Sequence, residues 1–226
     1  LGTVPVTELG MTLTHEHLFN DLSEAVHPGV RAFGPALATA TVSPQIAWLL
    51  REDPYACPDN CGIGPEHVET VAEELGLFRE AGGRTVVNNT TGPRFTPAER
   101  VTLIASCRGQ VATGLPLLVH LPGWQRRGHE VVDVALAEGV DPSALVLCHM
   151  DPSGKDTTYQ RELAERGVWL EFDMIGMPFN FPGEGQSPSV EDSVDAVAGL
   201  VRDGWADRLL LSQDTFLKAM WTRNAG

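Results

Sequence analysis

Five side chains in this sequence have the types and positions expected of ligands to a metal centre. They are His15, His17, His120, His149 and Asp214. On an extended strand, residues two apart lie on the same face, so His15 and His17 can bind one ion while Glu16 points away. Zinc and similar divalent metals favour imidazole nitrogen and carboxylate oxygen, and a catalytic site keeps one position open for water. Together the five residues predict a catalytic metal site.

Hydrophobic patterning indicates which elements position these ligands. Short runs rich in Val and Leu alternate with amphipathic segments, which is typical of strand–helix units around a parallel sheet. The predicted strands are residues 11–14, 84–89, 115–120, 144–149, 168–173 and 208–212, and the predicted helices are 66–80, 96–113, 130–137, 158–166 and 190–202. Every predicted ligand lies at or just beyond the carboxyl end of a strand. In a parallel α/β barrel these ends converge on one face, so the ligands are expected to meet there.

Local signals mark where several helices begin and end. Gly82 and Gly83 are expected to stop the first helix, since glycine readily adopts the left-handed conformation found just past a helix end. Thr96 and Pro97 open a capping box, with proline at the first helical position. Thr157 and Ser189 are predicted N-caps of the last two helices. Two long loops, residues 19–63 and 178–188, interrupt the alternation, and we expect them to be functional. The first is expected to contain a helix near 45–51.

Other residues near these positions have both a functional and a structural interpretation. Trp124 follows the strand that ends at His120, and it either walls a substrate pocket or covers the barrel rim. Asp173 either orients a ligand or contacts substrate, or else it makes an ordinary loop hydrogen bond. Lys218 and Arg223 either bind an oxygen of the substrate or are solvated surface charges. Of these, Trp124 and Arg223 are our predicted substrate contacts.

The remaining histidines and a pair of cysteines favour simpler interpretations. For His27, His67 and His129 we expect surface or helix-capping roles. Cys57 and Cys61 could be half of a metal site, but no second pair accompanies them, so loop thiols are the favoured interpretation.

Composition limits the classes of partner. The chain has 226 residues, 42% of them hydrophobic, which suits one globular domain. Its formal charge of -14 repels phosphate backbones and anionic lipid headgroups, so nucleic acid and membranes are not expected partners. No apolar run approaches the roughly 20 residues that span a bilayer, and the first ten residues lack the pattern of a signal peptide. A cytoplasmic enzyme is the default expectation.

Five ordered segments resemble the phosphotriesterase-related family of the amidohydrolase superfamily. They are residues 12–18 (TLTHEHL), 81–87 (AGGRTVV), 113–120 (TGLPLLVH), 146–149 (VLCH) and 211–214 (LSQD), which resemble its first, second, fifth, sixth and eighth strands. The resemblance covers nearly the whole chain and implies a single TIM-type (β/α)8 barrel domain over residues 1–226. It also implies two divalent ions, zinc by expectation, and a homodimer. By resemblance, His15, His17 and Asp214 hold the more buried metal, and His120 and His149 the more exposed one.

The sequence departs from the family between the second and fifth strands. Family members have two further strand–helix units there, and the fourth strand supplies a residue that bridges the metals. Here strands 3 and 4, the bridging ligand and the C-terminal helix are all missing, so six strands cannot close the usual barrel. Either on the order of 60 residues are omitted near residues 91–95, at roughly 30 per unit, or the chain carries a true deletion and is inactive. We expect omission, because a true deletion exposes two edges of a hydrophobic parallel sheet.

The resulting hypothesis is hydrolysis of an ester-type bond by a metal-activated hydroxide at a binuclear zinc-type centre. A lactone or carboxylic ester is the preferred small-molecule substrate, with phosphotriester hydrolysis as a side activity. Asp214 is the expected catalytic residue, taking up the proton released during attack. Two alternatives stay open: a catalytically inactive barrel remnant that acts as a metal-binding or interaction protein, and a mononuclear deaminase of the same superfamily.

Overall fold

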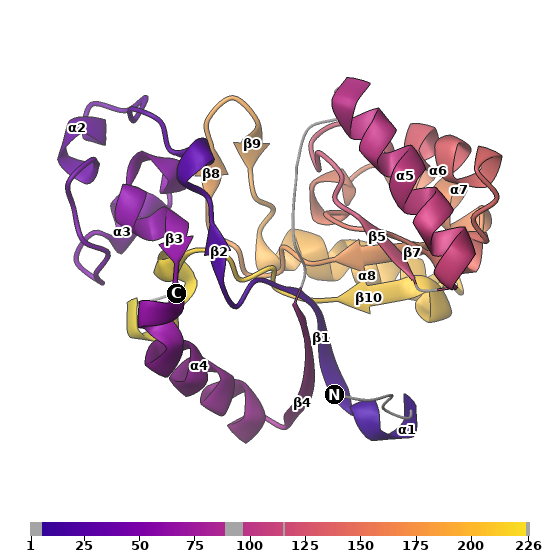
Figure 1. The fold of residues 1–226 in the computed structure, drawn as a ribbon, viewed down its shortest axis with the longest axis horizontal. Helices are drawn as coiled ribbons and strands as arrows, with labels where there is room; N and C mark the ends of the chain where they lie inside the picture. The colour runs from indigo at the N-terminus through magenta and orange to yellow at the C-terminus, as the bar shows by residue number, and fades with distance from the viewer. Residues whose placement is uncertain (1–5, 89–96, 115, 225–226) are drawn as a thin grey trace. The chain divides into compact units, whose positions relative to one another are not determined.

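The structure is a computed structural model that describes residues 6–88, 97–114 and 116–224 (Figure 1). The chain divides into two compact units. Unit 1 contains residues 1–90, 177–187 and 213–226, and unit 2 contains residues 91–176 and 188–212. Each unit has its own sheets and its own buried core.

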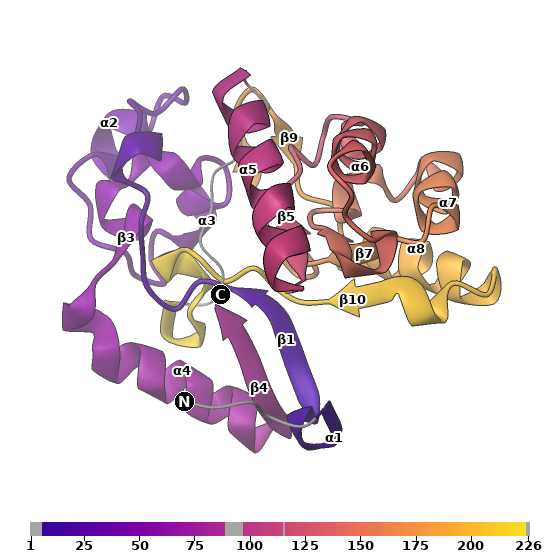
Figure 2. The same ribbon diagram turned by 45° about the vertical axis from the view of Figure 1, so that its right-hand side comes forward.

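In unit 1, the central feature is a pair of parallel strands. β1 (Met11–Glu16) pairs with β4 (Gly83–Asn88), and the two run side by side in Figure 2. The short α1 (Val6–Leu9) precedes β1, and α4 (Val68–Glu80) precedes β4. Gly82 has a φ of +97°, a left-handed conformation that lets the chain turn from α4 into β4 as predicted.

The long loop after β1 carries several short elements of unit 1. β2 pairs with β3 in an antiparallel manner, and the helices α2 and α3 lie between them in sequence. The second long loop forms a small hairpin of β8 and β9. The bounds are β2 Asn20–Asp21, α2 Gly34–Leu37, α3 Ala47–Leu50, β3 Gly62–Ile63, β8 Asn180–Phe181 and β9 Gly185–Gln186. The helix expected near residues 45–51 is therefore present as α3.

This first loop holds the segment that follows Asp214. The Asn20 side chain donates a hydrogen bond to the Phe216 carbonyl at 2.6 Å. The Asn60 side-chain oxygen accepts one from the Ala219 amide at 2.8 Å. Both bonds join residues more than 150 positions apart in sequence. The loop thus holds residues 216–219, which follow the predicted metal ligand Asp214.

Unit 2 is built around a four-stranded parallel sheet in the order β10, β7, β6, β5. One helix precedes each strand, and these helices lie close to the sheet in Figure 1. The bounds are α5 Pro97–Thr113, β5 Leu117–Val119, α6 Gly128–Ala137, β6 Leu145–Leu147, α7 Thr157–Glu165, β7 Trp169–Phe172, α8 Val190–Arg202 and β10 Leu209–Leu211.

The core of unit 2 lies between this sheet and its helices. Its fully buried members include Val131, Leu145, Leu147, Leu163 and Leu170. Burial of one such aliphatic side chain stabilises the folded state by roughly 1.5–3 kcal/mol. Apart from Glu171 in β7, the strands of this sheet are apolar along their length, so the other polar residues fall at their ends.

The fold class predicted from sequence is confirmed. All six predicted strands are present and parallel, in two sheets that do not close a barrel within the described residues. One predicted cap is wrong: Asp156, rather than Thr157, caps α7, its carboxylate accepting a hydrogen bond from the Tyr159 amide at 3.2 Å. The predicted break at 91–95 and the capping residue Thr96 lie outside the described residues.

Ser189 caps α8 as predicted, and this cap can be tested directly. Its hydroxyl accepts a hydrogen bond from the Asp192 amide at 3.1 Å. We expect Ser189→Ala to lower the free energy of unfolding by about 1 kcal/mol, because an amide at the helix start loses its acceptor. Denaturant unfolding measures the change. Thr158→Ala, at an exposed position in α7, is the control, and an equal effect of both variants would contradict the capping role.

Candidate functional site

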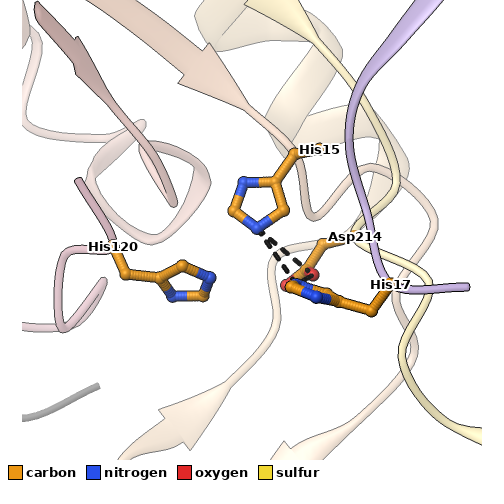
Figure 3. Close-up of side chains that lie close together, drawn as sticks. All are labelled: His15, His17, His120 and Asp214. Atoms are coloured by element: carbon orange, nitrogen blue, oxygen red, sulfur yellow. Dashed lines mark hydrogen bonds and ion pairs between the residues drawn. The ribbon is translucent and has the colours of Figure 1, made fainter. Parts of the chain in front are cut away.

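In unit 1, three of the predicted metal ligands converge at the carboxyl end of β1. The Nε2 atoms of His15 and His17 lie 3.3 Å apart. Asp214 Oδ1 lies 3.6 Å from Nε2 of His15 and 3.1 Å from Nε2 of His17. Figure 3 shows the three side chains pointing at a common point. All three residues are buried, with at most 5% of their surface exposed.

These distances match what a metal ion requires of its ligands. Zinc binds nitrogen and oxygen at about 2.0–2.1 Å in a tetrahedral arrangement, which places neighbouring donor atoms roughly 3.3 Å apart. The three donor separations in unit 1 lie close to that value. Two imidazoles and one carboxylate also leave coordination positions for other ligands. The residues present therefore fit a divalent metal.

Asp214 is held against β1 by backbone hydrogen bonds. Its amide donates to the His15 carbonyl at 3.1 Å, and the His17 amide donates to the Thr215 carbonyl at 3.0 Å. Glu16 points away from the two histidines, as the strand alternation predicts. Its carboxylate instead accepts hydrogen bonds from the amides of Gln213 and Thr215.

In unit 2, His120 and His149 form a second group of imidazole donors. Nε2 of His149 lies 2.5 Å from Nδ1 of His120, and the ring centroids are 4.1 Å apart. The ring nitrogens of two imidazoles that bind the same ion face each other in this way. The separation is shorter than the roughly 3.3 Å that an ion would set, so the rings would have to move apart to bind one. Both residues are partly buried.

Asp173 orients His149. Its carboxylate oxygens accept hydrogen bonds from the His149 amide at 3.0 and 3.1 Å, and Oδ1 lies 2.8 Å from the ring Nδ1. Asp173 is fully buried. Contacts of this kind fix the orientation and tautomer of a metal-binding imidazole, leaving the other ring nitrogen for the ion. Of the alternatives that the sequence left open for Asp173, the structure shows the orienting contact.

Backbone strain marks two of the predicted ligands. Among the described residues, His149 and Asp214 are the two non-glycine residues with positive φ, at 60° and 48°. A non-glycine residue in this region costs of order 1–3 kcal/mol and persists only where its surroundings impose it. Such strain concentrates at functional sites, and each of these residues is held by the contacts described above.

Sequence patterning did not assign a role to a buried thiol and carboxylate next to these residues. The Cys148 thiol donates a hydrogen bond to Glu171 Oε2 at 3.0 Å, and both residues are fully buried. Together with Asp173 they offer donor atoms within 4.8 Å of one another. The available signal was a single carboxylate inside the apolar run of β7, since charged residues are rarely buried without a partner.

The two predicted substrate contacts, Trp124 and Arg223, differ in how far they are exposed. Trp124 is half-buried in the turn before α6. Arg223 is exposed, and its Nη1 donates to the Thr70 hydroxyl of α4 at 2.9 Å. Of the two interpretations of Lys218, solvated surface charge is wrong. Lys218 is buried, because Asp59 pairs with its ammonium group at 2.8 Å.

The remaining histidines and the pair of cysteines make contacts with neighbouring protein groups or are buried in a loop. His67 Nδ1 accepts a hydrogen bond from the Gly64 amide at a helix start, and His129 lies 3.1 Å from Glu162 at the surface. His27 Nε2 lies 3.5 Å from the buried Asp53 carboxylate. Cys57 and Cys61 are buried thiols. Burial raises the pKa of the Cys61 thiol to about 12, which disfavours the thiolate that binds metals.

Parallel strands that end in converging imidazole and carboxylate donors define an α/β protein with a candidate metal site. The sequence pattern of the Phosphotriesterase family matches residues 1–93 and 90–226. The chain therefore belongs to the phosphotriesterase family. It is a metal-dependent hydrolase of the phosphotriesterase type.

Individual relatives agree with this assignment. The chain is 27% identical to an N-acetyltaurine hydrolase of Tetraodon nigroviridis over 301 aligned positions, covering 100% of this chain and 86% of that protein. Among solved structures, it is similar to a resiniferatoxin-binding protein from Rhodobacter sphaeroides, with a TM-score of 0.93, 32% identity, and coverage of 99% and 82%. An organophosphorus hydrolase from Deinococcus radiodurans gives a TM-score of 0.59 at 26% identity, with coverage of 94% and 77%.

Within the described part of the chain, no helix combines the length and apolar character that crossing a membrane requires.

The contact between Asp173 and His149 predicts a change in the histidine. In Asp173→Asn, one acceptor oxygen replaces two, so the amide and ring of His149 compete for it. We expect the free energy of unfolding to fall by about 1–3 kcal/mol, and the His149 tautomer to become mixed in metal-free protein. Denaturant unfolding and nitrogen NMR shifts measure the two effects. Asp133→Asn, at an exposed ion pair with Arg166, is the control, and an unchanged His149 tautomer would contradict the orienting role.

The pair of Asp59 and Lys218 predicts how stability depends on pH. Burial raises the pKa of Asp59, but the hydrogen bonds from Lys218 and the Val42 amide outweigh it and hold the pKa below its ordinary 3.8. The carboxylate therefore stabilises the fold above pH 3.8, and this stabilisation is lost as the pH falls through the lowered pKa. We expect Asp59→Asn to destabilise the protein at pH 7 and to differ less from wild type near pH 3. Urea unfolding between these values tests this, and a constant difference would exclude it.

Proposed function

We propose that this hydrolase cleaves an ester-type bond at a binuclear zinc-type centre. The observation that carries the proposal is the convergence of the His15, His17 and Asp214 donor atoms at the separations that one ion sets. Their burial agrees with a more buried metal. The pair of His120 and His149, which is more exposed, is the proposed second set of ligands.

The proposed roles of the protein's own residues follow from their contacts. When bound, divalent metals lower the pKa of water toward neutrality and polarise the oxygen of the bond under attack. His15 and His17 would hold a metal through their Nε2 atoms, which face Asp214. Asp214 has a buried carboxylate held by the backbone of β1, and it is proposed to accept the proton released during attack. Asp173 keeps His149 oriented.

We further propose that residues 1–226 are parts of one barrel domain from which a segment near residues 91–95 is missing. Two matches to the family pattern meet at residues 90–93. The alignment of 301 positions exceeds the chain length of 226, so the Tetraodon relative has positions without a counterpart here. The bridging ligand expected from the fourth strand would lie in that segment. A homodimer and a cytoplasmic location stay predictions from the sequence.

The substrate we propose is a lactone or carboxylic ester, with phosphotriesters as a side activity. Trp124 and Arg223 are the proposed substrate contacts. A second candidate is an N-acylated amine, because several relatives are named N-acetyltaurine hydrolases. The same hydroxide chemistry serves both classes. Rates measured on a lactone, an aryl ester, a phosphotriester and N-acetyltaurine separate these candidates.

The alternative is an inactive barrel remnant that retains some ligands, and a metal count discriminates between the two. Close to two equivalents of zinc per chain, together with hydrolysis, supports the enzyme. Zero or one equivalent without turnover supports the remnant.

Asp214→Asn is the direct test of the proposed catalytic residue. We expect turnover to fall at least roughly 100-fold, because the neutral amide cannot accept the proton. The thermal unfolding midpoint of the metal-free protein should stay close to that of wild type. Hydrolysis rates of the metal-loaded protein, before and after chelation, provide the measurement. Asp192→Asn, which alters a partly exposed carboxylate beside Lys155, is the control. Full activity of Asp214→Asn would remove Asp214 from the mechanism.

A further inference from the structure

We propose that Glu16 is a positioning residue that holds Asp214 in its ligand conformation through the two amides on either side of it. The proposal rests on the proposed function, since it treats Asp214 as a metal ligand. It concerns unit 1 alone, where all the residues involved are found.

The Glu16 carboxylate spans the residue that it positions. Its Oε1 accepts a hydrogen bond from the Gln213 amide at 3.2 Å, and its Oε2 accepts one from the Thr215 amide at 2.7 Å. Glu16 is only 3% exposed. Burial excludes water that would compete for these two hydrogen bonds. The backbone on both sides of Asp214 is therefore held by one side chain.

The conformation of Asp214 explains why a side chain is needed there. At a φ of 48°, Asp214 leaves the extended geometry in which successive amides could pair with a neighbouring strand. Its own amide still reaches the His15 carbonyl. The amides before and after it are satisfied by the Glu16 carboxylate instead. Buried amides are nearly always paired, so the left-handed conformation depends on this acceptor.

Glu16 also links Asp214 to the two histidines. It lies between His15 and His17 in β1, with its side chain on the opposite face. Holding the 213–215 backbone on that face fixes the distance from the Asp214 carboxylate to the two imidazoles, 3.6 and 3.1 Å. A shift of this backbone would separate the donors by more than one ion tolerates. The middle residue of the His-x-His segment thus acts on the metal site without contacting the metal.

The experiment measures zinc affinity of the metal-free protein by competition with a chromophoric chelator. Glu16→Gln keeps the size of the side chain but offers one acceptor oxygen, and its NH2 group would face an amide donor. We expect zinc binding at the site of His15, His17 and Asp214 to weaken roughly 10–100-fold. The visible spectrum of the cobalt-loaded protein should change as well. Glu74→Gln is the matched control, because Glu74 also accepts from a backbone amide and a hydroxyl of one residue, Thr222, in the same unit.

A double-mutant cycle separates positioning from a general effect on stability. If Glu16 acts through Asp214, Glu16→Gln should weaken zinc binding little further in an Asp214→Asn background. Wild-type zinc affinity and cobalt spectrum in Glu16→Gln would overturn the proposal, even with a lower unfolding midpoint. Should Glu16→Gln fail to fold, Glu16→Asp replaces it; it keeps the charge but is too short to span both amides, and the same weakening is expected.

The outcomes also separate this proposal from the proposed function. If the wild-type protein binds no zinc, the proposed function fails. If it binds zinc and Asp214→Asn weakens that binding while Glu16→Gln does not, the positioning role alone fails.

Discussion

The hydrogen-bonded contact between the end of β1 and residues 213–215 is the constraint on which the unit 1 site depends. It joins two segments that are about two hundred positions apart, and together they supply His15, His17 and Asp214. Because the ligand conformation of Asp214 is strained, the contact must be maintained on both sides of the residue. The first long loop serves this need, since its Asn60 holds the Ala219 amide and its Asp59 binds the ammonium group of Lys218. The long loop that the sequence predicts to be functional thus anchors the segment that follows the predicted ligand Asp214.

A related arrangement is present in unit 2. His149, just beyond β6, has a φ of 60°, and its amide donates to the carboxylate of Asp173, the residue that follows the neighbouring strand β7. In unit 1 the Glu16 carboxylate accepts from the amides on either side of Asp214, while in unit 2 the Asp173 carboxylate accepts from the amide of His149 itself. In both cases a buried carboxylate pairs with an amide that the left-handed residue takes out of regular strand pairing.

The sequence predicted the strands and their ligands because both depend on local patterns. Apolar runs mark β1 and β6, and the period of two in a strand places His15 and His17 on one face. The conformations of His149 and Asp214 could not be predicted, since left-handed backbone there depends on acceptors from distant residues. The burial of Lys218 depends on Asp59, 159 positions away. Even the cap of α7 was misplaced by one residue, because Asp156 and Thr157 are both good capping types and only the backbone decides between them.

The buried carboxylates finally give a physical reason for a cation in this protein. In unit 1, Glu16 and Asp214 are both buried, and Glu16 contacts the residues on either side of Asp214. The Glu16 carboxylate accepts hydrogen bonds from the amides of Gln213 and Thr215, so both of its oxygens are partnered within the protein. Asp214 faces two imidazoles whose nitrogen atoms are as close to each other as to its oxygen. Imidazole nitrogen and carboxylate oxygen are the donor types that zinc-type cations prefer, and here three of them face one point. A divalent ion bound at that point would hold all three donors in place, so metal binding and the strained conformation of Asp214 should stabilise each other.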